Sequence, residues 1–173
     1  MADKNQKPED DQDDSAPRGR GYGNYGNYGN YGGAERLEPH AAGMLDALAR
    51  ATDWVWISGN HDQGRVPSGT AVEELELGGI MLRHEAVPGE ARPELSGHFH
   101  PRLKVVARGR RVVRPCAVAS ERKLILPAFG ALTGGMDAAD PAIIAALQPA
   151  RAVDALLGVR GRLVQYPLWR AAA

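Results

Sequence analysis

Four of the five histidines fall into three short clusters that suit metal-assisted chemistry. The clusters are Gly59-Asn60-His61-Asp62, Arg83-His84-Glu85 and Gly97-His98-Phe99-His100-Pro101. Each follows a segment patterned like a β-strand, so we expect several imidazoles to point into one crevice at the strand ends. Imidazole and asparagine oxygen together suit Mn²⁺, Fe²⁺ or Zn²⁺ in a mixed shell, which favours hydrolysis over redox chemistry.

The third cluster has a spacing that favours two ligands on one side of the chain. In an extended segment, residues two apart face the same way, so His98 and His100 are both expected to reach a metal cluster while Phe99 turns into the core. Gly97 is expected to let the backbone come close. His40 stands alone on a predicted helix and is interpreted as an ordinary structural residue.

The order of the three clusters resembles the second half of the calcineurin-like metallophosphoesterase pattern. That resemblance implies that Asn60, His84 and His98 bind one cation and that His100 binds another. It also implies that His61 contacts the phosphate or protonates the leaving group. Asp62 would orient His61 from behind. Two such cations clamp a phosphoryl group, and no side-chain nucleophile is needed.

The wider surroundings resemble the ligase-associated DNA damage response endonuclease family, PdeM, over residues 35–168. The likeness rests on residues 53–62, on the two later histidine clusters, and on residues 126–135. It implies a Mn²⁺ enzyme that cleaves DNA phosphodiesters in the company of a DNA ligase and a helicase. A small phosphodiester or phosphomonoester is the alternative substrate. Residues 127–135 either line the cleft or form a tight turn against the core, and we favour the turn.

Two motifs of the resembled pattern do not occur: no Asp is followed two residues later by His, and no Gly is followed directly by Asp. These motifs supply the bridging carboxylate and most ligands of the position that keeps only His100. Bringing two cations together without an anion is unfavourable, so the sequence predicts one bound ion or none rather than a tight pair. Losing the leading β-α units is also expected to expose a sheet edge and an apolar face.

The elements that must position these residues follow from hydrophobic periodicity and from Gly and Pro breaks. The pattern predicts helices at 37–52, 141–147 and 150–157. It predicts strands at 53–58, 71–77, 80–84, 94–97, 103–107, 111–114, 123–126 and 162–166. The expected class is α/β to α+β: a partial metallophosphoesterase β-sandwich flanked by helices.

Residues 1–33 differ from the rest in composition. Six acidic residues and two lysines lead into a Gly-Asn-Tyr repeat with no aliphatic side chain, which predicts a disordered tail. Residues 34–173 are then the folded domain. Residues 102–123 hold eight basic residues against Glu121 alone, which indicates either a nucleic-acid contact or a solvated face.

A single cysteine, Cys116, and no apolar stretch long enough for a bilayer predict a cytoplasmic protein without membrane contact. Three hypotheses follow. The first is a phosphoesterase of the DNA-repair endonuclease type, active or inactive as it stands. The second is a non-catalytic truncated or fused remnant that binds one metal weakly and binds nucleic acid. The third is an unstable fragment.

Overall fold

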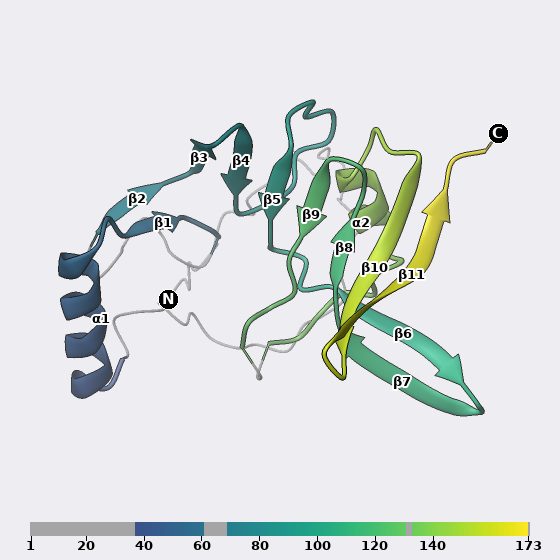
Figure 1. Cartoon of the computed structure of the whole chain (residues 1–173), viewed down its shortest axis with the longest axis horizontal. Helices are drawn as coiled ribbons and strands as arrows, with labels where there is room; N and C mark the ends of the chain where they lie inside the picture. Colours follow the sequence, from purple (N-terminus) through teal and green to yellow (C-terminus); the bar gives the residue numbers. More distant parts are fainter. Residues whose placement is uncertain (1–36, 61–68, 131–132, 173) are drawn as a thin grey trace, which may run out of the picture.

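Strands dominate this protein in a computed structural model that describes residues 37–60, 69–130 and 133–172. The main sheet has the order β11-β10-β8-β9-β5-β4-β3 (Figure 1). Its strands are β3(Glu74–Leu77), β4(Ile80–Arg83), β5(Glu94–Ser96), β8(Ala117–Ala119), β9(Lys123–Ile125), β10(Ala152–Val159) and β11(Arg162–Arg170). The mixed α and β class expected from the sequence is therefore confirmed.

The centre of this sheet is parallel and its flanks are antiparallel. Strands β4, β5 and β9 run in one direction, whereas β3, β8, β10 and β11 join through antiparallel pairs. Parallel neighbours end at the same edge of a sheet, so the residues that follow β4 and β5 lie side by side. Because His84 and Gly97-His98 occupy those positions, the sheet brings two of the histidine clusters together.

Two smaller sheets complete the β structure of the described residues. Strand β1(Val55–Ile57) pairs in parallel with β2(Thr70–Val72), and β6(Arg102–Ala107) pairs with β7(Arg110–Pro115) as a hairpin that extends away from the main sheet (Figure 1). The single strand predicted at 71–77 is wrong in one respect. A bend at Glu73 divides it, so β2 pairs with β1 while β3 pairs with β4.

Three of the hairpins turn on two residues with positive φ. The turn residues are Gly78-Gly79, Arg108-Gly109 and Arg160-Gly161. Turns of this hand match the twist of the strands they join, which is why a glycine stands at the second position in each. The sequence signal for these turns was correct.

The helices begin as their sequences predict. Helix α1(Pro39–Ala51) starts at a proline, and the Glu38 carboxylate accepts hydrogen bonds from the backbone of His40 and Ala41. None of its residues is buried. Helix α2(Pro141–Ala146) is capped by Asp140. Neither described helix has the length and apolar character needed to span a bilayer.

The helix predicted at 150–157 is wrong, because this segment forms β10. It pairs with β8 on one edge and β11 on the other, so its backbone groups are satisfied by sheet neighbours. Its alanines and leucines favour a helix locally, but alternate residues Val153, Ala155 and Leu157 are buried in the core. Tertiary pairing overrides local propensity here. Strand β8, three residues long, was not predicted at all.

The hydrophobic core lies around α2 and strands β8, β9 and β10. Its largest fully buried aliphatic side chains are Ile125, Ile143, Leu147, Val118 and Val153. Cys116 belongs to the same cluster, and burial raises the pKa of its thiol to about 11. A thiol that stays protonated is a core residue rather than a reactive one.

A buried charged network crosses the parallel strands. On β4, Arg83 forms ion pairs with Glu94 of β5 at 3.2 Å and with Glu90 at 3.3 Å, and Glu74 of β3 lies 3.2 Å from it. Glu94 and Lys123 are cross-strand partners in β5 and β9. Burial raises the pKa of Glu94 and lowers the pKa of Lys123, because both groups lose hydration.

Lys123 is held by backbone oxygens rather than by a direct ion pair. Its ammonium donates to the carbonyls of Val87 at 2.6 Å, Ala146 at 3.0 Å and Gln148 at 3.2 Å. Two of these carbonyls lie at the carboxyl end of α2, where helix oxygens lack partners of their own. One buried cation thus fastens β9 to the helix and to the loop that follows His84.

Replacing Lys123 should test this connection. We expect Lys123→Met to lower the free energy of unfolding by about 3 kcal/mol or more, because three carbonyls lose their donor and Glu94 loses a nearby positive charge. Lys104→Met is the matched control, since Lys104 is exposed and its one ion pair, with Asp137, is long at 3.8 Å. It should lower the free energy of unfolding by less than about 1 kcal/mol. Urea unfolding measures both, and equal effects would contradict the assignment.

Candidate metal centre

Three donor atoms meet where β1, β4 and β5 end. Asn60 follows β1, His84 follows β4 directly, and His98 follows β5 after Gly97. The Nε2 atom of His84 lies 2.9 Å from Asn60 Oδ1 and 3.0 Å from His98 Nδ1. Residues 38 positions apart in sequence are therefore brought to one point.

These separations fit a single cation. Donors about 2.1 Å from a metal and at right angles to one another lie about 3.0 Å apart, which is the spacing of octahedral neighbours. The His84 and His98 rings meet edge to face, with their centroids 5.0 Å apart. All three atoms carry lone pairs that a cation could accept.

The group of three donor atoms includes an asparagine oxygen, from Asn60. Among the described residues, no three His, Cys, Asp or Glu side chains gather closely enough to hold a metal. Asn60 would supply the third donor beside the two histidines if a metal binds here. A carboxylate lies just outside the group, with Glu85 Oε2 3.8 Å from His98 Nε2. Glu85 was not predicted as a site residue, although it directly follows His84 in the sequence.

The backbone around His98 and His100 differs from the predicted extended segment. Both residues have positive φ, 65° and 49°, so this segment is a loop with two left-handed residues. The prediction that simple alternation would align the two imidazoles is therefore wrong. Phe99 between them does pack against the core, as expected. Left-handed histidines are uncommon, and such conformations persist where surrounding structure enforces them.

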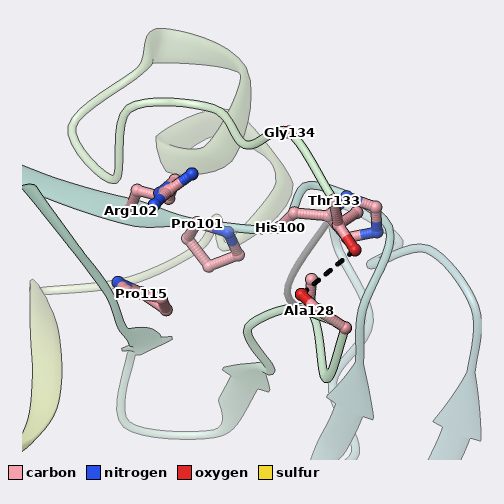
Figure 2. A pocket seen from close by; sticks show the side chains of 8 residues that line it. His100, Pro101, Arg102, Pro115, Ala128, Thr133 and Gly134 are labelled. Atoms are coloured by element: carbon pink, nitrogen blue, oxygen red, sulfur yellow. Dashed lines mark hydrogen bonds between the residues drawn. The ribbon is translucent and has the colours of Figure 1, made fainter.

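His100 lines a pocket next to these donors. The pocket has a volume of about 80 Å³. Its lining residues are His100, Pro101, Arg102, Pro115, Ala128, Gly130, Thr133 and Gly134 (Figure 2). Ala128, Gly130, Thr133 and Gly134 therefore line a cavity, and the Thr133 hydroxyl donates a hydrogen bond to the Gly130 carbonyl oxygen at 3.3 Å, so the described part of this segment has features of both interpretations. Of the other predicted residues, His61 and Asp62 lie outside the described residues, and His40 is exposed on α1.

Two glycines, Gly59 and Gly135, pack closely against the histidines of the site, whereas the expected glycine, Gly97, does not. A Cβ on Gly97 would meet the His84 carbonyl oxygen at an ordinary 3.7 Å, so Gly97 is not required for space. A Cβ on Gly59 would lie 2.5 Å from His84 Nδ1, and one on Gly135 would lie 2.5 Å from the carbonyl oxygen of His100. The sequence offered no signal that separated these glycines from the others.

Comparison with known proteins places this geometry in context. No protein-family model and no curated protein sequence matches the chain. Among solved structures, it is similar to the crystal structure of the Pseudomonas putida nuclease MPE, with a TM-score of 0.53 and 32% sequence identity. The match covers 73% of this chain and 59% of the nuclease, so the chain spans little more than half of that protein. The fold is thus nuclease-like, consistent with a metallophosphoesterase-like architecture.

The contact at Gly59 can be tested without a metal. We expect Gly59→Ala to displace the His84 imidazole, because the added methyl group would occupy the place of Nδ1. The ¹H–¹⁵N signals of the His84 ring should then shift or broaden. Gly97→Ala is the matched control and should leave them unchanged. Unaltered His84 signals in Gly59→Ala would show that the ring does not rest on this glycine.

The backbone conformation of His98 predicts an unusual order of stability. The free energy of unfolding of His98→Gly should exceed that of His98→Ala by about 1 kcal/mol, because only glycine adopts positive φ without steric cost. Arg111 on β7 provides the opposite comparison, and there glycine should be less stable than alanine by roughly 0.5–1 kcal/mol. Denaturant titration of the four variants measures these differences. A higher free energy of unfolding for His98→Ala than for His98→Gly would contradict the argument that His98 is strained.

Proposed function

We propose that this protein is a metal-dependent phosphodiesterase that cleaves nucleic acid. The observation that carries the proposal is the meeting of Asn60, His84 and His98 at the ends of separate strands, at the spacing of ligands to one ion. The likeness to a nuclease of known structure supports the same reaction class. A site of three neutral donors suits a hard or borderline divalent cation, and Mn²⁺ is our first choice over Fe²⁺ or Zn²⁺.

In this proposal the chain's residues have distinct tasks. Asn60, His84 and His98 hold the cation, which when bound supplies Lewis-acid polarisation of a phosphoryl oxygen. His100, in the neighbouring pocket wall, belongs to a second metal position. His61 contacts the phosphate or protonates the leaving oxygen, and Asp62 keeps that imidazole oriented.

Glu85 adds a further task. His98 presents Nδ1 to the other donors, and its Nε2 faces the Glu85 carboxylate across 3.8 Å. A carboxylate that accepts a hydrogen bond from a metal-binding imidazole fixes the ring and raises its basicity, and Glu85 would need to move only slightly closer to do so. In a set of three neutral ligands, Glu85 also brings a negative charge close to the cation. We therefore assign Glu85 a positioning role.

We further propose that the substrate is DNA and that the reaction belongs to ligase-associated repair, alongside a DNA ligase and a helicase. The motif runs that resemble the PdeM family support this finer assignment. The sequence has no Asp-x-His or Gly-Asp motif, so occupancy of the second metal position should be weak. Activity is accordingly expected to need high Mn²⁺ concentration.

Hydrolysis of bis-p-nitrophenyl phosphate tests the reaction class. We expect Mn²⁺-dependent release of nitrophenolate that chelation with EDTA abolishes. His98→Ala should lower turnover by about a hundredfold or more, since loss of a metal ligand exceeds the usual effect of losing an outer-shell partner. His40→Ala is the matched control, because His40 is exposed on α1, and it should retain full turnover.

Two outcomes would contradict the proposal. Absence of turnover with Mn²⁺, Fe²⁺ and Zn²⁺ would exclude a phosphodiesterase. Turnover that survives His98→Ala would place the active site elsewhere. Mn²⁺ binding without turnover, lost in His98→Ala, would instead favour the non-catalytic metal-binding module.

A further inference from the structure

The β6–β7 hairpin carries a positive charge that the metal centre does not explain. Residues 102–115 include five arginines, one lysine and no acidic residue. Residues directly opposite in an antiparallel pair share a face. By the register of β6 and β7, one face therefore carries Arg102, Lys104 and Arg111, and the other carries Arg110 and Arg114.

The two faces have different surroundings. Leu103 is buried and Val105 packs against the core, so the face that they share with Arg110 and Arg114 turns toward the protein at its base. The opposite face begins at Arg102 and its partner Pro115, both of which line the pocket that contains His100 (Figure 2). We call this second face, with Arg102, Lys104 and Arg111, the pocket face. Its cations form a row that leads from the pocket toward the hairpin tip.

The charges of the pocket face are scarcely neutralised within the described part of the chain. Lys104 has one distant partner, Asp137 at 3.8 Å, and no ion pair to Arg102 or Arg111 is formed by the described residues. The Nε donor of Arg102 is buried without a hydrogen-bond partner there. A row of cations with only one carboxylate beside it among the described residues attracts a polyanion.

An exposed aromatic residue, Phe129, lies in the chain between two residues that line the same pocket. Ala128 and Gly130 line the pocket, and the Phe129 side chain between them is fully exposed, at 109% of its reference area. Large aromatic side chains are rarely left fully in water, and exposed rings beside basic grooves provide platforms on which nucleic-acid bases stack. A nucleic-acid strand offers both a row of phosphates and aromatic base faces, which are the two features that this surface matches.

We infer that the pocket face and Phe129 together form a binding surface for a nucleic-acid strand. Arg102, Lys104 and Arg111 contact successive phosphates, and Phe129 stacks on a base near the pocket. Strands of six residues give the arm a length of about 20 Å, over which the three basic side chains are spread. The inference rests on the proposed function for the class of substrate, but strand binding itself needs no bound cation.

Fluorescence anisotropy of a labelled single-stranded oligonucleotide in EDTA tests the surface, using the full chain. We expect Lys104→Gln/Arg111→Gln to weaken binding about tenfold or more. The slope of log K against log salt should fall in magnitude by about 1.4, since each phosphate contact on a single strand contributes about 0.7. Arg110→Gln/Arg114→Gln removes the same charge from the other face and should change affinity by less than about threefold.

Phe129→Ala separates stacking from charge. It should weaken binding about tenfold while leaving the salt slope unchanged, because base stacking involves no phosphate contact. Thermal melting of each variant should match the parent protein, since all the changed side chains are exposed. The 1–33 segment is present in every variant, so any contribution from it is common to all.

The inference is overturned if the Lys104→Gln/Arg111→Gln and Arg110→Gln/Arg114→Gln double variants weaken binding equally, or if neither double variant weakens it. It is also overturned if the Lys104/Arg111 pair spares oligonucleotide binding and instead abolishes binding to phosphatidylserine vesicles or to polyglutamate. Because the measurement contains EDTA, failure here leaves Mn²⁺-dependent hydrolysis of the small substrate untouched. Conversely, absence of Mn²⁺-dependent hydrolysis would contradict the proposed function without affecting the binding of the oligonucleotide in EDTA.

Discussion

A carboxylate and an ammonium buried side by side in the parallel strands set the main physical constraint on this protein. Glu94 and Lys123 occupy paired positions on β5 and β9, and both side chains are withdrawn from water. Burial of charge is costly unless each group is surrounded by partners. Arg83 supplies one partner to Glu94, and three backbone carbonyls supply partners to Lys123. The relative positions of β4, β5, β9 and α2 must satisfy all of these contacts at once.

The candidate site benefits directly from that constraint. His84 follows Arg83 by one residue, and His98 lies four residues after Glu94. Any slip of β4 against β5 would break the Arg83–Glu94 ion pair and separate the two imidazoles. The network therefore holds in register the strands that deliver the donor atoms. Rigid strands that carry a site on their following loops are a common way to position side chains precisely enough for metal binding.

The loops after the strands set the orientation of the histidine rings. Positive φ at His98 and His100 aims two imidazoles that an extended chain would place differently, and the close approach of Gly59 supports the His84 ring. Beyond this centre, the pocket joins His100 to the base of the β6–β7 hairpin and to the segment bearing Phe129. The pocket thus connects His100 with the first basic residue of the cationic row, Arg102.

Much of this organisation could be predicted because it depends on local signals. Glycines marked the hairpin turns, helical spacing marked α1, and a run of aromatic and β-branched residues marked the strand that precedes Asn60. The helix expected at 150–157 failed because Ala and Leu favour helices locally, while β8 and β11 provide hydrogen bonds that only the assembled sheet contains. The same limitation hid β8, whose three residues are too few for a periodic pattern.

The sequence by itself determined which donor types this protein carries, their order, and their placement after strands, since these follow from residue chemistry and short-range pattern. Only the tertiary structure decided that Asn60, His84 and His98 share one point while His100 faces the adjoining pocket. It also decided which glycines are indispensable and that one face of the basic hairpin continues from that pocket. These features depend on contacts between residues tens of positions apart, and on backbone conformations that the surrounding packing imposes.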